Sequence, residues 1–481
     1  MMDMQDLDTN TPVDESVADE TPAETDQNLN SSDLKPITLT EAAAAVLATN
    51  DRYGLYTVPG AKLYPHQWLW DSCFVAIGLR HIDNERAQTE ILSLLRGQWS
   101  NGMLPNIIFN DDKAYARDRN AWRSWVNPHS PDQVSTSGIT QPPMLAEAIV
   151  RIGEFMTLSD RRAWYKSVWP ALLAYHEWLY AERDPHAEGL VLQIHPWEIG
   201  MDNTPPWMDY MHGHQMPFWI RTLQKLKLIG VVGSFRRDAQ TVPLDERFET
   251  IEILALFDTQ RRLRRKAYDI NKILDHSLFL IEDVAFNSIF IRANQQLLDI
   301  AETLGVTVSP VLLKRIELSK KAFENLWDEE TKQYYSRNFI SHKLLKVPSV
   351  ATLLPLYAGS VSKKRAAELV KMIENDQEFG PAFPLPTTPV NSPWFQPMRY
   401  WQGPTWLNIN WLVIDGLKRY GFDDHAAALT DLSLEMVQKS GFAEYFDPIT
   451  GEPLGTDNFS WTAALAIDLF ETAAKEQPDA N

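Results

Sequence analysis

The chain has 481 residues, 44% of them hydrophobic and 23% charged, which is typical of a globular protein with a large core. No apolar run is long enough to predict a membrane span, and the first residues lack the basic and apolar regions of a signal peptide. The net charge of −19 disfavours nucleic acid and anionic membranes as partners, and the single cysteine, Cys73, predicts a reducing, cytoplasmic location.

An acidic segment begins the chain. Residues 1–34 contain ten Asp or Glu and no Lys or Arg, with Ser, Thr, Asn and Pro between them. Such a composition buries too little apolar surface to fold, so we expect a disordered tail over residues 1–35. The folded domain is expected to span residues 36–475.

From residue 38 onward, hydrophobic periodicity predicts about a dozen helices. Their ranges are 40–47, 75–95, 144–156, 161–183, 216–228, 248–258, 268–304, 312–325, 360–373, 406–420, 423–438 and 460–475. No Gly-x-Gly-x-x-Gly turn indicates a dinucleotide fold, and no internal repeat of fixed period indicates a solenoid. We therefore expect an all-α domain in which helical hairpins close into a ring.

Tryptophan is unusually frequent, with 17 residues, many of them beside polar residues in predicted loops. An indole ring suits the apolar face of a sugar, while neighbouring Asp, Gln and Asn bind its hydroxyls. Taken singly, each of these tryptophans could instead attach a loop to the helix ends. Their clustering with carboxylates and amides favours a carbohydrate pocket.

Three aromatic clusters each contain a carboxylate. They comprise residues 64–74 with 97–106 and 137–143, residues 197–205, and residues 400–406 with 443–448 and 458–461. Hydrolysis of a glycosidic bond needs a carboxylic acid to protonate the leaving oxygen and an opposing carboxylate. Aromatic and apolar surroundings raise the pKa of a carboxyl enough to keep it protonated near neutral pH.

At these residues the chain resembles glycoside hydrolase family 63. The matching motifs, in order, are Trp68-Leu69-Trp70-Asp71-Ser72, Gly102–Pro105, Ser137–Pro143, Gly200–Pro205, Trp401–Trp406 and Phe459–Thr462. The resemblance is greatest to the small bacterial branch of mannosylglycerate and glucosylglycerate hydrolases, although the Trp-Asp-Ser element also resembles trehalases. It implies a single (α/α)6 barrel with long Trp-rich loops at one face, and an inverting mechanism.

The resemblance also implies roles for individual residues. The general acid falls on Asp202, the general base on Glu444, and Asp71 would bind hydroxyls of the released sugar. The other residues implied for that subsite are Tyr64, Trp68, Tyr115, Gln141, Tyr400, Trp401 and Trp406, with Tyr115 transferred across a more variable spacing. No cofactor or metal is implied.

Each carboxylate has an alternative interpretation. Asp202 could stabilise a turn before the two prolines that follow it, and Asp71 could be the N-cap of a helix beginning at the next residue. Glu452 and Asp447 occupy the same turn as Glu444 and compete with it for the role of base.

Further charged residues fit supporting roles. Glu198 is expected to support the acid, not to replace it. His212 and His214 lack a third ligand at a spacing that would bind a metal. The basic block at residues 261–266 is interpreted as a solvated helix face or as a contact for the acidic tail.

The segment after the acid departs from the glycerate-releasing pattern. There, an Arg and a Tyr hold the glycerate carboxylate, and our alignment places Val242 and Phe248 at those two positions. We therefore expect a neutral glucoside to compete well with glucosylglycerate. The alternative is that Arg236, Arg237 or Arg247 restores the acid site.

The sequence thus predicts an inverting α-glucosidase that acts on a small glucoside of the compatible-solute type, such as glucosylglycerate or glucosylglycerol. A trehalase, an α-mannosidase of the mannosylglycerate type and a non-catalytic sugar-binding protein remain alternatives. The expected partner is a small carbohydrate, and self-association into a homo-oligomer is left open.

Overall fold

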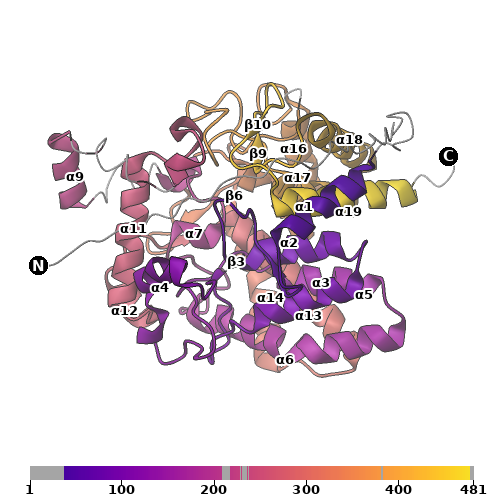
Figure 1. Cartoon of the computed structure of the whole chain (residues 1–481), viewed down its shortest axis with the longest axis horizontal. Helices are drawn as coiled ribbons and strands as arrows, with labels where there is room; N and C mark the ends of the chain where they lie inside the picture. The colour runs from indigo at the N-terminus through magenta and orange to yellow at the C-terminus, as the bar shows by residue number, and fades with distance from the viewer. Residues whose placement is uncertain are drawn as a thin grey trace, which may run out of the picture. The chain divides into compact units, whose positions relative to one another are not determined.

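The computed structural model describes residues 37–208, 217–227, 229, 236, 238–380 and 383–476. Six helices of the described chain form a closed inner ring (Figure 1). They are α2 (Leu69–Leu79), α5 (Leu145–Glu154), α13 (Val284–Leu304), α15 (Pro355–Ala358), α17 (Leu407–Arg419) and α19 (Ser460–Glu476). Each packs against the next, and α19 packs against α2. The all-α, (α/α)6-barrel prediction is therefore confirmed.

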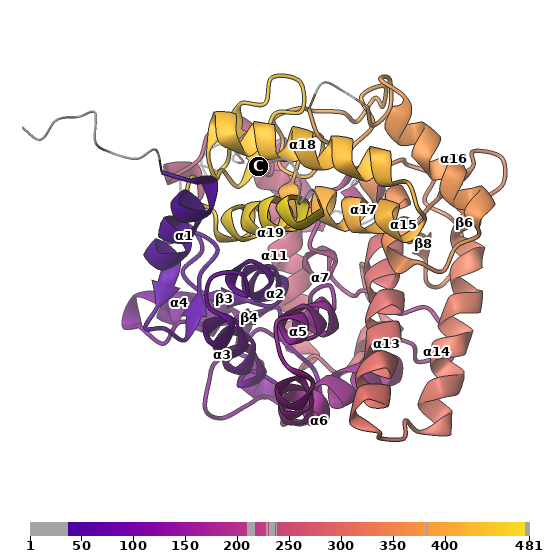
Figure 2. The ribbon, with the colours of Figure 1, turned by 90° about the vertical axis from the view of Figure 1, so that its right-hand side faces the viewer.

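Six further helices surround this ring and alternate with it along the chain (Figure 2). They are α1 (Leu39–Asn50), α3 (Asn84–Leu95), α6 (Leu158–Glu182), α14 (Pro310–Phe323), α16 (Lys363–Glu374) and α18 (Asp423–Ser440). The patterning explains the two layers: every residue of α2 is buried, whereas α3 buries one face and exposes the other. An apolar stripe suits an outer helix and an all-round apolar surface suits an inner one.

Connecting segments carry the remaining elements. The helices are α4 (Ala116–Trp122), α7 (Pro196–Ile199), α9 (Phe218–Lys225), α11 (Thr250–Arg265) and α12 (Ile270–Asp275). The antiparallel strand pairs are β1 (Asp51–Arg52) with β2 (Tyr56–Thr57), β3 (Gln67–Trp68) with β4 (Ile107–Ile108), β5 (Ile281–Glu282) with β8 (Arg337–Asn338), β6 (Trp327–Asp328) with β7 (Gln333–Tyr334), and β9 (Tyr445–Phe446) with β10 (Pro453–Leu454). In the described part of the chain, no helix is long and apolar enough to cross a membrane.

The longest predicted helix is wrong in extent. The range 268–304 contains α12, strand β5 and α13, because the side chains of Asp269 and Asp283 each cap a new helix by accepting backbone N–H groups. The range 75–95 contains an amphipathic helix as expected, α3, whose N-cap is Asp83, together with the end of α2. The predicted tail at residues 1–35 lies outside the described residues.

The aromatic loops lead into the N-terminal ends of inner helices. Trp68 is the N-cap residue of α2 and Trp406 that of α17, while Ser460 and Trp461 begin α19. The segment that ends in Gln141 precedes α5. The ring thereby brings loops that are far apart in sequence to the same end of the barrel.

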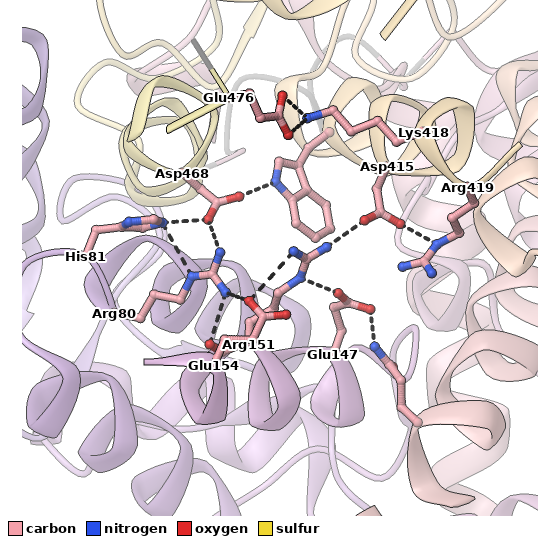
Figure 3. Close-up of polar contacts among 12 residues, drawn as sticks. Arg80, His81, Glu147, Arg151, Glu154, Asp415, Lys418, Arg419, Asp468 and Glu476 are labelled. Atoms are coloured by element: carbon pink, nitrogen blue, oxygen red, sulfur yellow. Dashed lines mark hydrogen bonds and ion pairs between the residues drawn. The ribbon is translucent and has the colours of Figure 1, made fainter. Parts of the chain in front are cut away.

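A network of charged groups, many of them buried, connects the inner helices (Figure 3). Glu147 of α5 accepts hydrogen bonds from Arg151 (2.7 Å), from Tyr357 of α15 (2.7 Å) and from Gln296 of α13. Arg151 also pairs with Asp415 of α17 at 2.6 Å. Three inner helices therefore meet at the carboxylate of Glu147, and Arg151 connects a fourth.

A second carboxylate of this network extends it to the other two inner helices. Asp468 of α19 lies 2.8 Å from Arg80, which is the C-cap residue of α2, and 2.8 Å from His81. It also accepts a hydrogen bond from Trp411 of α17 at 2.8 Å. Arg80 in turn pairs with Glu154 of α5 at 2.6 Å, so that, together with Tyr357 of α15 and Gln296 of α13, the network includes all six inner helices.

We predict that Glu147→Gln lowers the free energy of unfolding at neutral pH by about 3–5 kcal/mol, because it leaves buried arginines without their anion. Arg151 and Arg292 lower the pKa of Glu147 from its ordinary 4.5 to about 2. A lowered pKa contributes stability above pH 4.5 that is lost as the pH falls toward 2. The difference between wild type and variant should therefore shrink over that range.

Denaturant unfolding at a series of pH values measures this difference. Glu476→Gln is the matched control, because Glu476 pairs with Lys418 in a more exposed ion pair between inner helices α17 and α19, and surface pairs contribute little. An equal loss of stability in both variants, or a Glu147→Gln penalty that does not depend on pH, would contradict the account.

Candidate active site

One cavity of about 160 Å³ gathers most of the predicted site residues. Its lining includes nine of the ten predicted side chains: Tyr64, Trp68, Asp71, Gln141, Asp202, Tyr400, Trp401, Trp406 and Glu444. The tenth, Tyr115, is not among the lining residues and packs edge-on against His66, with ring centres 5.2 Å apart. The lining residues that the sequence analysis did not assign to the sugar site are Pro59, Trp70, Trp197, Gly200, Arg247, Phe248, Ile253, Phe459 and Trp461.

Asp71 lies in the first turn of α2. The prediction that it caps a helix starting at Ser72 is wrong, because α2 begins at Leu69 with Trp68 as its N-cap residue. Burial raises the pKa of Asp71 well above its ordinary value, and the nearby carboxylates Glu444 and Glu90 raise it further. A carboxyl at this place can bind sugar hydroxyls as donor or as acceptor.

Asp202 follows the short helix α7 and is partly exposed to the cavity. Gly200 turns the chain with a positive φ of 81°, and a Cβ atom there would lie 2.6 Å from the ring of Trp70. Asn203 then accepts the backbone N–H of Trp401 at 2.9 Å, and its carbonyl accepts the amide of Gln402 at 2.9 Å. These contacts fix the loop of Asp202 to the loop of Trp401.

The surroundings of Asp202 favour its protonated form. Burial raises the pKa of Asp202 well above its ordinary value, Arg247 opposes this shift, and Asp71 and Glu444 add to it. If Asp202 stabilised a turn, its carboxylate would accept a backbone N–H. Among the described residues, no backbone N–H is bonded to that carboxylate.

Glu198 supports the wall of the cavity. It is fully buried and pairs with Arg183 at 2.8 Å. Its carboxylate also accepts the backbone N–H groups of Ile194 at 2.7 Å and of Thr140 at 3.2 Å, next to Gln141. This arrangement agrees with the expected supporting role.

Glu444 is buried between three donors. Its Oε1 accepts the hydroxyl of Tyr64 at 2.7 Å and the Nη1 of Arg247 at 3.2 Å. Its Oε2 accepts the backbone N–H of Thr456 at 3.2 Å. An ion pair and two further hydrogen bonds therefore hold the carboxylate of Glu444 in place.

The two carboxylates that compete with Glu444 lie outside the lining of the cavity. Asp447 accepts the backbone N–H of Ile449 at 2.7 Å within its own turn. Glu452 lies 3.9 Å from Lys439 in a solvent-exposed pair. Of the three candidates in this turn, Glu444 is therefore the one placed at the cavity.

Arg247 is the basic side chain of the cavity lining. Our alignment gave the arginine position to Val242, which is buried outside the lining, whereas Arg247 was one of three possible substitutes. Arg236 is held by Asp238 at 2.6 Å and by the carbonyl of Phe248 at 2.7 Å. Arg237 lies outside the described residues, as do His212 and His214.

Both aromatic rings and unpaired polar atoms belong to residues that line the cavity. Trp401 stacks on Trp406 with ring centres 3.8 Å apart. The Nε1 atoms of Trp68 and Trp401 and the Oε1 atom of Gln141 are buried without a hydrogen-bond partner among the described residues. A sugar offers apolar C–H faces to the rings and hydroxyls to these polar atoms. Within the described ranges, no group of His, Cys, Asp and Glu side chains could hold a metal ion.

A ring of six helical hairpins with two electrostatically distinct carboxyls at one aromatic cavity is the arrangement of (α/α)6-barrel glycoside hydrolases. Residues 64–462 match the model of the mannosylglycerate hydrolase MGH1-like glycoside hydrolase domain. The chain belongs to this family and is a glycoside hydrolase, as its resemblance to glycoside hydrolase family 63 predicted.

Curated relatives and a solved structure agree with this assignment. A mannosylglycerate hydrolase of Thermus thermophilus is 38% identical over 88% of this chain and 99% of its own length. A glucosylglycerate hydrolase of Mycolicibacterium hassiacum is 33% identical over 90% and 98%, respectively. The crystal structure of a Thermus thermophilus mannosylglycerate hydrolase in complex with Tris and D-glycerate has a TM-score of 0.80 and 36% identity, covering 90% of this chain and 100% of that one.

We predict that Asp202→Asn and Glu444→Gln each lower kcat/KM for a glycoside substrate by about 10²–10⁴-fold, the usual contribution of a general acid or base. Glu452→Gln is the matched control in the turn of Glu444 and should remain within about twofold of wild type. Initial-rate kinetics of the three folded variants measure the effect. A similar loss in Glu452→Gln, or near-normal turnover by Glu444→Gln, would refute the assignment.

Proposed function

We propose that this enzyme hydrolyses a small α-glycoside with inversion, with Asp202 as general acid and Glu444 as general base. The supporting observation is the electrostatic contrast within one cavity. Burial raises the pKa of Asp202 and favours its protonated form, whereas Glu444 is paired with Arg247 and accepts a hydrogen bond from Tyr64. Pairs of carboxyls in opposite protonation states are what this reaction requires.

The reaction follows from these states. Asp202 gives its proton to the oxygen of the glycosidic bond as the bond to the anomeric carbon breaks. A water molecule forms the new bond to the anomeric carbon from the opposite side, and Glu444 takes the proton that this water loses. An α-glycoside therefore yields a β-sugar, and the proton returns to Asp202 through solvent.

The sugar subsite is proposed to consist of the tryptophans and of Asp71 and Gln141. Buried polar atoms without partners would bind hydroxyls, because leaving them unpaired costs about 1–3 kcal/mol each. Glucose and mannose differ at one hydroxyl next to the anomeric carbon. The side chain that binds this hydroxyl therefore determines which of the two sugars is accepted. The relatives include hydrolases of both glycerate derivatives.

For the leaving group, the position of Arg247 favours an acid over a neutral polyol. A buried guanidinium at the cavity offers the charge-assisted bonds that a carboxylate needs. This supports the alternative in which Arg247 restores the acid site, in place of our expectation of a neutral glucoside. A cytoplasmic location is also proposed, supported by the lone cysteine, Cys73, which is free and buried.

The anomer released first tests inversion. Proton NMR of a fresh hydrolysate should show the β-sugar before mutarotation, because water attacks the face opposite to the leaving group. Asp202→Ala serves as the blank for background hydrolysis. Early appearance of the α-anomer would overturn the inverting assignment.

A substrate comparison tests the leaving group. We expect kcat/KM for glucosylglycerate or mannosylglycerate to exceed that for glucosylglycerol by at least about tenfold, the value of one charge-assisted hydrogen bond. Arg247→Gln should remove this preference and leave turnover of the neutral glucoside less affected. An equal kcat/KM of the wild type for a neutral glucoside or for trehalose would contradict the role of Arg247 and support a neutral leaving group.

A further inference from the structure

A further cavity, of about 650 Å³, lies at the C-terminal ends of two inner helices. Its lining includes Gly359, the C-cap residue of α15, and Tyr420, the C-cap residue of α17. The active-site cavity contains Trp406, the N-cap residue of the same α17. The 13 residues of α17 separate the two places by roughly 20 Å, so this cavity is distinct from the active site.

Every charged side chain in the described lining of this cavity is basic. The four are Arg292 of α13, Lys320 of α14, Lys363 of α16 and Arg419 of α17. The whole chain carries a net charge of −19, so a cavity lined by cations alone departs from the overall charge balance. Like charges that converge on one cavity repel one another, and an anion bound between them would remove that repulsion.

The two lysines of this cavity have no carboxylate partner among the described residues. Lys320 lies 3.5 Å from the amide oxygen of Gln295, which also belongs to the lining. Lys363 is exposed and is the first residue of α16, which has 12 residues and is capped by Ser362. The N-terminus of a helix adds partial positive charge at this side of the cavity.

The two arginines are bound at one side to the network of the inner ring. Arg419 donates to Asp415 at 2.6 Å (Figure 3). The Nε of Arg292 lies 3.7 Å from Glu147, whose carboxylate accepts shorter hydrogen bonds from Arg151 and Tyr357. Arg292 is therefore incompletely neutralised by its own carboxylate neighbour.

Two buried polar atoms of lining residues also lack partners. The Nε of Arg292 and the Oγ of Ser360 have no hydrogen-bond partner among the described residues. Buried polar groups in proteins are nearly always hydrogen-bonded, so each unpaired group needs an explanation. A ligand with several acceptor oxygens accounts for an unpaired arginine and an unpaired hydroxyl in one cavity.

We propose that this cavity binds a small molecule that carries a phosphate group. Its volume lies within the range of small-molecule sites, about 300–1,000 Å³. Guanidinium, ammonium and hydroxyl groups together are the donors that bind phosphate oxygens. Four cations favour an anion with more than one negative charge over a single carboxylate. The inference goes beyond the proposed reaction and does not depend on it.

Calorimetric titration of the full chain with inorganic phosphate, at constant ionic strength, tests the site. We expect saturable binding that the double variant Lys320→Gln/Lys363→Gln weakens by at least about tenfold, the contribution of one charge-assisted hydrogen bond or more. The matched control is Lys321→Gln/Lys364→Gln, which removes the same charge from the next positions of the same helices, outside the lining. Its Kd should stay within about twofold of wild type.

A further variant distinguishes this cavity from the active site. Arg247→Gln removes the basic side chain of the active-site lining and should leave the Kd for phosphate unchanged. Arg292→Lys keeps the charge and removes the guanidinium, and should weaken binding because a single ammonium cannot form two parallel hydrogen bonds. Circular dichroism and denaturant unfolding establish that each variant compared is folded.

Three results would overturn the proposal: no saturable binding of phosphate to the wild type, equal weakening in the two lysine double variants, or loss of binding in Arg247→Gln alone. The second would mean that phosphate responds only to total charge, and the third that it binds in the active site. Glucose 6-phosphate identifies the source of the phosphate group. Tighter binding than that of inorganic phosphate would indicate a phosphate ester, and no gain would indicate free phosphate, and both results support the site.

Discussion

The closure of the inner ring depends on two buried carboxylates, Glu147 and Asp468. Packing alone would let six apolar helices slide along one another, whereas a buried ion must keep every one of its partners. Arg151, shared between Glu147 and Asp415, connects α5 with α17, two inner helices that are not neighbours in the ring. The N-terminal ends of these helices, and the loops that lead into them, are positioned as a consequence.

The pairing of carboxylates with arginines differs between this network and the cavity. The carboxylates of the network are matched by arginines, and the pKa of Glu147 is accordingly lowered. Among the described residues that line the cavity, three carboxyls, Asp71, Asp202 and Glu444, share one cation, Arg247. Burial raises the pKa of Asp202, which Arg247 only partly offsets, and the arginine makes its direct contact with Glu444. The acid and the base are thus distinguished by which carboxyl the arginine touches.

The fold and most of the cavity residues could be predicted from the sequence because both depend on local residue patterns. Inner helices such as α2 are mostly apolar and buried throughout, and motifs such as Trp68–Ser72 combine a helix start with side chains of the cavity. Arg247 was not assigned to the cavity, since its partner Glu444 lies 197 positions away and a loop alignment cannot reveal that contact. Tyr115 was transferred by spacing alone, and its ring packs against His66 instead.

The separation of the carboxyl groups of Asp202 and Glu444 tests the central claim most directly. A crystal structure of Asp202→Asn with an intact α-glycoside would give the distance between the amide of the variant and the carboxylate of Glu444. The account predicts about 6.5–9.5 Å, with a water molecule between Glu444 and the anomeric carbon. A separation near ~5 Å, with Glu444 in contact with the anomeric carbon, would contradict inversion and the role of Glu444 as a base.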